Sequence, residues 1–215
     1  MKVTFVYDPE KDAEILLKFG KGGSHSARPI EAYQALIATA GSEPTQADAK
    51  AFVATYPSQI GIDIPSRVRE DQAEWDSVAD AFTHRAEQVF GVALPHDVIA
   101  YLTVSGRCPY NINQNLYFVY MKYPHKARST SMHELWHFYT WYRLGRIWEA
   151  KLGKARYEDL KESLTVLLNI ECADLMPEGI TDKGYSQHQE LRAEIAKAWA
   201  ATGDIEAVWQ RLAAA

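Results

Sequence analysis

TSMHELWHFYTW, residues 130–141, places His133 and His137 four positions apart, with Glu134 directly after the first histidine. Successive residues of an α-helix are about 100° apart, so the two histidines would lie one turn apart on the same face. Their imidazoles can then share one metal ion, at roughly 2.0–2.1 Å for each bond between zinc and nitrogen. We therefore expect a helix here that carries two ligands of a metal site.

Glu134 lies one step around this helix, beside the metal position and not on it. A carboxylate in that place can take a proton from a coordinated water without becoming a ligand itself. Zinc lowers the pKa of such a water to about 7, which makes Glu134 a candidate general base. The alternative is a core helix in which the two histidines are packed among the surrounding aromatic side chains.

The neighbouring residues favour the metal site over the core helix. Thr130 precedes His133 by three positions, the two inner positions of the pattern are uncharged, and Phe138 and Tyr139 follow His137. This extended signature resembles that of the zincin metallopeptidases. The resemblance covers roughly residues 115–170.

The resemblance implies a zincin-like fold, a Zn²⁺ cofactor and a hydrolase that cleaves peptide bonds in a peptide or protein substrate. In zincins, a strand before the helix pairs through its edge with the substrate backbone, and NLYFVYM, residues 115–121, occupies that place. The polar residues Ser129 and Thr130 follow this strand and are candidates for the helix cap.

The third ligand determines the subclass. After the second histidine, the chain lacks the later glycine and histidine of the metzincins, which excludes that subclass. Gluzincins instead use a glutamate from a later helix, and this resemblance implies Glu162, which follows His137 after 24 intervening residues. A spacer of this length allows the first helix to end and a second helix to return antiparallel to it.

The helix that carries Glu162 is amphipathic. Glu162 lies nearly opposite its apolar face, on the same side as Thr165 and Asn169. The apolar face comprises Leu160, Leu164 and Leu167. Either this polar side closes a metal cleft, or Glu162 is simply exposed to solvent.

Other residues remain candidates for the third ligand. A histidine among them would give a site with three histidines, and the spacing does not exclude that arrangement. These alternatives are Glu158, Glu171, Asp174 and His188.

Peptide hydrolysis also needs a group that stabilises the oxyanion of the tetrahedral intermediate. Tyr185, His188 and Arg192 lie together in DKGYSQHQELR, residues 182–192. We expect Tyr185 or His188 to serve this role, although an ordinary polar helix start explains the cluster equally well.

The rest of the chain predicts an α+β fold of zincin-like type, with a small mixed sheet packed against a mostly helical C-terminal half. Residues rich in β-branched and aromatic types predict strands within 2–8, 96–106 and 115–123. Helical patterns cover most of the remainder. They lie at residues 9–20, across 29–91, and at 130–144, 156–169, 188–202 and 204–213.

We divide the chain into residues 1–95, an N-terminal strand with a helical region, and residues 96–215, a zincin-like catalytic region. The two are expected to form one compact unit. Residues 20–29 are rich in Gly and Ser before a proline, which indicates a flap or a linker.

Composition excludes several classes of protein. The net charge is −5 without any block of basic residues, which argues against binding to nucleic acid or to an anionic membrane surface. No apolar run is long enough to span a bilayer or to act as a signal peptide. With only two cysteines, Cys108 and Cys172, we expect a cytoplasmic protein.

Two other functions fit the same residues. A zincin-like domain that has lost activity would serve as an interaction or regulatory module, although the retained Glu134 argues against this. A metal-dependent hydrolase acting on another kind of bond would use the same residues as a peptidase.

Overall fold

The structure, a computed structural model, describes residues 1–22 and 30–213. Most of the predicted flap or linker at residues 20–29 therefore lies outside the part that is described. The chain forms two compact units that alternate along the sequence. The sheet unit comprises Lys2–Asp76 and His96–Thr130, and the helical unit comprises Met1, Ser77–Pro95 and Ser131–Ala215. The predicted division after residue 95 falls at one of the points where the chain passes between them.

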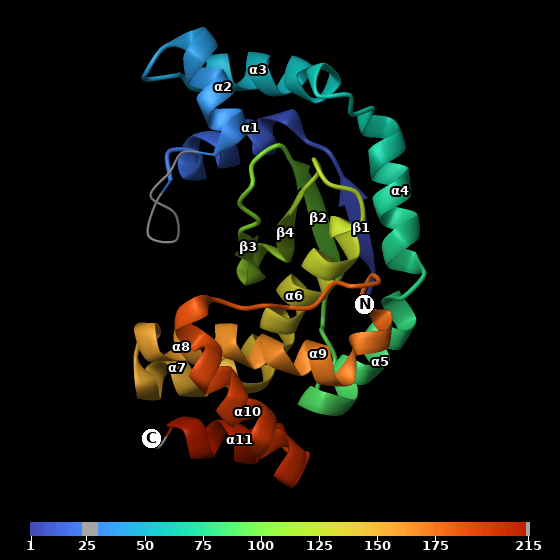
Figure 1. The fold of residues 1–215 in the computed structure, drawn as a ribbon, viewed down its shortest axis with the longest axis vertical. Helices are drawn as coiled ribbons and strands as arrows, with labels where there is room; N and C mark the ends of the chain where they lie inside the picture. The colour runs from blue at the N-terminus through green and yellow to red at the C-terminus, as the bar shows by residue number, and fades with distance from the viewer. Residues whose placement is uncertain (23–29, 214–215) are drawn as a thin grey trace. The chain divides into compact units, whose positions relative to one another are not determined.

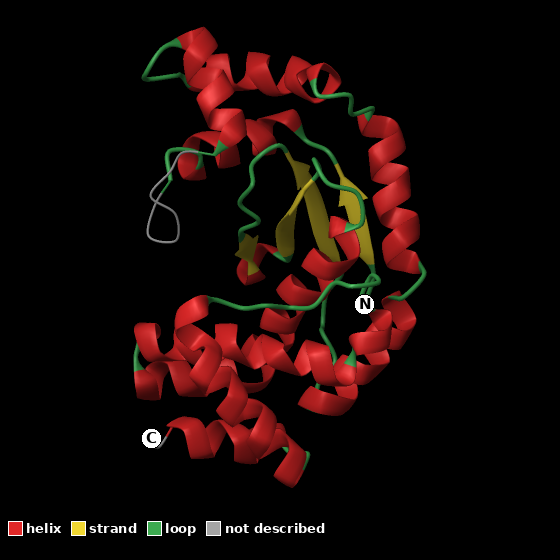
Figure 2. Ribbon diagram, in the orientation of Figure 1, coloured by secondary structure: helices red, strands yellow, loops and turns green. Residues whose placement is uncertain are grey.

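The sheet unit holds the strands, which Figure 2 shows in yellow. The sheet order is β1-β2-β4-β3, in which the first three strands are parallel and β3 is antiparallel to β4. The strands are β1 (Val3–Val6), β2 (Val98–Thr103), β3 (Tyr110–Asn111) and β4 (Leu116–Tyr120). The predicted strands and the mixed α+β class are thus confirmed.

The position of β4 differs from the prediction. We expected an open edge along NLYFVYM, but β4 lies between β2 and β3 in the sheet. Tyr110 pairs with Tyr117 and Asn111 with Leu116, so the start of β4 is covered on that side. The strand β3 was not predicted, because a strand of two residues is too short to give an alternating pattern.

Helices surround the strands of the sheet unit. They are α1 (Pro9–Phe19), α2 (Glu31–Ala40), α3 (Gln46–Gln59) and α4 (Ile64–Asp76). In Figure 1, α4 runs beside β1, and the side chain of Gln72 binds the outer backbone of this strand. It accepts from the N–H of Phe5 at 2.9 Å and donates to the carbonyl of Val3 at 3.1 Å.

A buried carboxylate joins α1 to the end of β2. Asp12 is fully buried, and its Oδ1 accepts hydrogen bonds from Oγ1 of Thr103 at 2.6 Å and from the N–H of Val104 at 3.1 Å. Burial raises the pKa of Asp12 to about 6, although these two hydrogen bonds oppose the shift. The folded state therefore holds this proton more tightly than the unfolded chain does.

We predict that Asp12→Asn makes the fold less sensitive to pH. The raised pKa stabilises the folded state below the unfolded value of about 3.9, and this contribution is lost as the pH rises through 6. Between pH 5 and pH 8 the free energy of unfolding of the wild type should fall by about 1–2 kcal/mol more than that of the variant. Urea unfolding at the two pH values measures this difference, and equal pH dependence in both proteins would contradict the assignment.

The helical unit contains the predicted metal-binding helix. Its helices are α5 (Ala79–Phe90), α6 (Lys126–Thr140), α7 (Arg146–Leu152), α8 (Lys154–Leu164), α9 (Leu168–Glu171), α10 (Gln189–Thr202) and α11 (Ile205–Ala213). By its contacts, the start of α6, up to Thr130, belongs to the sheet unit. The predicted cap at Ser129 or Thr130 is wrong, because α6 begins at Lys126 and both residues lie inside it. Within residues 1–22 and 30–213, no helix has the length and apolar character needed to cross a membrane.

A π-helical turn, Trp141–Gly145, follows α6 directly. Gly145 is buried, and a Cβ atom built on it would lie 2.2 Å from Cε3 of Trp141 and 2.8 Å from the hydroxyl of Tyr157. Because Tyr157 belongs to α8, the missing side chain at Gly145 allows this helix to pack closely against the turn. Turns of this kind are often found at functional sites.

We therefore predict that Gly145→Ala destabilises the protein by about 1–3 kcal/mol, because the added methyl group has no room. Gly106→Ala is the control, since the atom nearest to its added Cβ would be 3.9 Å away. Thermal unfolding measures both variants. If the two melted alike, the close packing at Gly145 would not be a constraint.

Candidate metal centre

Trp136 holds α6 against α8. Its side chain is fully buried, and Nε1 donates a hydrogen bond to the carbonyl of Leu164 at 3.2 Å. The indole ring also packs edge-on against Phe90, with the ring centroids 4.9 Å apart. The buried leucines predicted for α8, Leu160 and Leu164, lie in the core as expected. This packing brings the polar sides of the two helices face to face.

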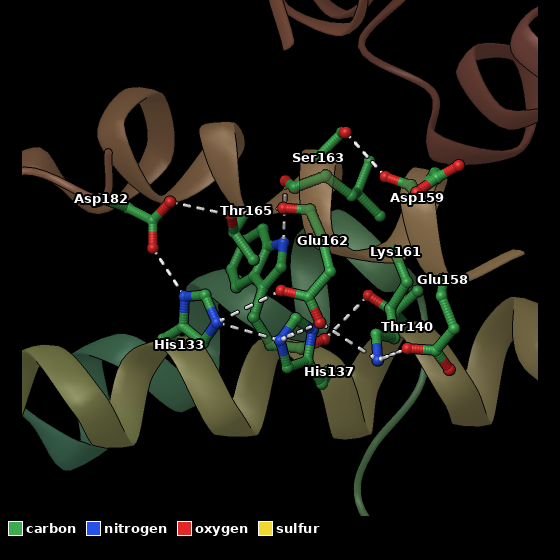
Figure 3. A network of polar contacts seen from close by, with 12 residues as sticks. His133, His137, Thr140, Glu158, Asp159, Lys161, Glu162, Ser163, Thr165 and Asp182 are labelled. Carbon is green, nitrogen blue, oxygen red and sulfur yellow. Dashed lines mark hydrogen bonds and ion pairs between the residues drawn. The ribbon is translucent and has the colours of Figure 1, made fainter. Parts of the chain in front are cut away.

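His133, His137 and Glu162 converge between these helices, as Figure 3 shows. The Nε2 atoms of the two histidines lie 3.0 Å apart. Nε2 of His137 is 3.4 Å from Oε1 of Glu162, and Nε2 of His133 is 3.8 Å from Oε2. Two ligands of a tetrahedral zinc ion lie roughly 3.4 Å apart when each bond is about 2.1 Å long. The cluster therefore has the size that one ion requires.

The group is also distinct within the structure. One ligand atom from each of the three residues lies within 4.8 Å of the other two. In the part of the chain that the structure describes, it is the one set of three or more His, Cys, Asp or Glu residues that could hold a metal ion. Two imidazoles and one carboxylate are donors that suit zinc and several other transition metals.

Asp182 fixes the orientation of His133. The Nδ1 atom of His133 donates to Oδ2 of Asp182 at 2.6 Å, which leaves Nε2 directed toward His137 and Glu162. Histidines that bind metals commonly donate their other ring N–H to a carboxylate in this way. The contact sets the tautomer that the metal needs on His133.

Asp182 is itself held by both its backbone and its side chain. Oδ1 accepts a hydrogen bond from Thr165 at 2.8 Å and lies 3.0 Å from Nη2 of Arg192. The backbone N–H and carbonyl of Asp182 both bind the side-chain amide of Asn169, at 2.8 and 2.7 Å. Gly184 permits the close approach of the guanidinium, because a Cβ there would lie 2.6 Å from Nη1 of Arg192. The loop is thus held by the 3-10 turn that follows α8, by α9 and by α10.

Burial and close contacts set the ionisation of the groups at the centre. Burial raises the pKa of the Glu162 and Asp182 carboxyls, but hydrogen bonds from His137 and His133 outweigh it and hold both below their ordinary values. Burial and the positive charge of His133 lower the pKa of His137 to about 4. For His133, burial is opposed by the hydrogen bond to Asp182, and its pKa rises to about 9. Two ionised carboxylates therefore face one neutral and one protonated imidazole.

Glu134 lies on α6 next to His133 and is only 6% exposed. Burial raises its pKa to about 7, although the positive charge of His133 opposes the shift. A general base is most effective when its pKa is near the working pH. Glu134 therefore combines burial beside the first histidine with a pKa near neutrality, and its role as a general base stays a prediction.

The predicted oxyanion groups Tyr185 and His188 contact each other, and His188 contacts Asp159. His188 is buried, and its Nε2 lies 3.1 Å from Oδ1 of Asp159. Tyr185 is 39% exposed, and its ring packs edge-on against that of His188, with the centroids 5.6 Å apart. The third member of the predicted group, Arg192, contributes to the centre by binding Asp182. The structure thus groups Tyr185 with His188, and their role as oxyanion groups stays a prediction.

The alternative third ligands have other partners. Glu158 binds Lys161 at 2.5 Å, and Glu171 accepts a hydrogen bond from Trp199 at 2.6 Å. Asp174 forms an ion pair with Arg85, and His188 contacts Asp159 as described above. Glu162 is therefore the acidic residue that the fold brings to the two histidines.

Sequence reasoning missed Asp182 and Lys161. Asp182 comes from a loop 49 positions after His133, so no helical spacing connects the two residues. The polar residues Thr165 and Asn169, on the same side of the helix as Glu162, were the available signal that a buried polar partner was needed. Lys161 gave no signal, since a lysine beside a glutamate is common on exposed helices.

Comparison with known proteins does not assign the chain to a family: no family model matches the sequence, and neither a curated protein nor a solved structure matches it significantly. What the fold and the site define is an α+β protein with a candidate metal centre of two histidines and one glutamate.

We predict that Asp182→Asn weakens zinc binding by about 10–100-fold, because His133 loses the carboxylate that orients it. Competition with a chromogenic chelator measures the dissociation constant. Asp174→Asn is the matched control, since Asp174 is an exposed carboxylate of the same unit whose ion pair with Arg85 lies outside the cluster. Unchanged affinity in Asp182→Asn would show that the contact with His133 does not support the metal.

Proposed function

We propose that this protein is a zinc-dependent hydrolase that cleaves peptide bonds, a metallopeptidase of zincin type. The observation that carries the proposal is the convergence of His133, His137 and Glu162, with the buried carboxylate of Glu134 beside them. The spacing of His133, Glu134 and His137 in the sequence matches the zincin signature, which supports the proposal. The choice of zinc and of the peptide bond rests on the resemblance of residues 130–139 to that signature.

In the proposed reaction, each of these residues would have a separate role. His133, His137 and Glu162 would hold the ion, which supplies a Lewis acid that polarises the carbonyl group and makes water more acidic. Glu134 would accept a proton from the attacking water and then transfer it to the nitrogen of the leaving amine. Asp182 would keep His133 in the required tautomer throughout.

Glu134 also favours an active enzyme over an inactive interaction module. An interaction domain has no need for a buried carboxylate beside the histidines, since burial of a charged group is costly unless it serves a purpose. Retention of Glu134 at 6% exposure, with a pKa near 7, therefore supports an active enzyme. A hydrolase that acts on other bonds would use the same groups. Assays with several kinds of substrate are therefore needed to distinguish it from a peptidase.

We predict that Glu134→Gln lowers peptide cleavage by about 10²–10⁴-fold while zinc remains bound, because the variant keeps the ligands and loses only the base. Cleavage of a mixed peptide library by zinc-loaded protein is followed by mass spectrometry, together with ester and amide model substrates. Glu194→Gln is the control, since Glu194 is an exposed glutamate on α10. Cleavage of esters or amides alone would indicate another hydrolase, and no cleavage by the zinc-loaded wild type would favour the inactive module.

A further inference from the structure

Lys161 is a buried cation next to the candidate metal centre. It precedes Glu162 on α8, and its side chain is only 3% exposed. The ammonium group lies 2.5 Å from Oε2 of Glu158 and 3.2 Å from Oε1 of Glu162. Burial of an ammonium group is costly unless it is paired in this way. Lys161 is thus fixed between two carboxylates, one of which is the candidate third ligand.

The two oxygens of Glu162 have different surroundings as a result. Oε1 is in contact with the ammonium of Lys161 and lies 3.4 Å from Nε2 of His137. Oε2 lies 3.8 Å from Nε2 of His133, on the side of the carboxylate that faces the first histidine of the pair. An oxygen that already accepts a charge-assisted hydrogen bond has less electron density to offer to a metal ion.

This difference matters because a carboxylate can bind a metal through one oxygen or through both. Catalytic zinc sites have three protein ligands and keep one position open for water and substrate. A glutamate that used both of its oxygens would add a fourth protein donor to the ion. Carboxylates that bind a metal are themselves hydrogen-bonded by neighbouring groups, which orient them toward the ion.

We propose that Lys161 is a positioning residue that restricts Glu162 to a single coordinating oxygen and so keeps one position of the metal open. The inference rests on the metal centre of the proposed function and adds to it the control of coordination number. Glu158 has a supporting part, because its carboxylate holds the other side of the ammonium group. Neither Lys161 nor Glu158 has a counterpart in the signature that suggested the metal site.

The test uses cobalt(II) in place of zinc, because its visible absorption reports coordination number. Four-coordinate cobalt absorbs strongly, and the bands weaken and shift when a fifth donor is added. In Lys161→Met, which keeps the length of the side chain and removes its charge, we expect the absorption to fall while one cobalt ion per chain stays bound. Lys161→Arg restores a cation and should restore the absorption of the wild type. Lys154→Met, at the first residue of α8, is the matched control.

The outcomes distinguish this inference from the proposed function. If the wild type binds cobalt and Lys161→Met gives the same spectrum, the role of Lys161 is overturned while the metal centre stands. If the wild type binds no cobalt, both the centre and the inference fail. Near-ultraviolet circular dichroism identifies a variant that has not folded. If Lys161→Met does not fold, the cobalt spectrum of Lys161→Arg is compared with that of the wild type. Weaker absorption in Lys161→Arg would contradict the inference.

Discussion

The packing of α6 against α8 through Trp136 is the constraint on which the candidate site depends. The indole N–H satisfies the carbonyl of Leu164 near the end of α8, and the ring is fully buried. Because this contact fixes the separation of the two helices, it also fixes the distance between His137 and Glu162, at 3.4 Å. Two residues that lie far apart in the sequence thus become partners through a hydrophobic contact beside them.

A cluster of buried polar groups is expensive to assemble, and the surrounding network offsets that cost. Asp182 accepts a hydrogen bond from Nδ1 of His133, Arg192 and Thr165 stabilise Asp182, and Lys161 stabilises Glu162. Each charge therefore has a partner of opposite sign or a hydrogen bond. Preorganisation of this kind is what the proposed metal site would require.

The sequence predicted those parts of the structure that depend on local spacing. The shared face of His133 and His137 follows from the period of one helix. Glu162 was implied by the resemblance to gluzincins, and the spacer after His137 is long enough for a second helix to return. Asp182 could not be predicted in this way, because a loop brings it to His133 without any regular spacing. Tyr185 and His188 follow Asp182 closely in the sequence, and their role as oxyanion groups stays a prediction. Neighbours in sequence there separate in space, so that Asp182 faces His133 while His188 faces Asp159. In the sheet, β3 was missed because two residues carry no periodic signal.

The central claim is that these two helices hold one metal ion, and the most direct measurement is the zinc content of the purified protein by plasma mass spectrometry. His137→Ala and Glu162→Ala are compared with the wild type after all three are supplied with zinc and dialysed. The account predicts close to one zinc ion per chain in the wild type and a clear loss in both variants. Wild-type protein without bound zinc would contradict it, and so would full zinc content in Glu162→Ala, because Glu162 would then not be the third ligand.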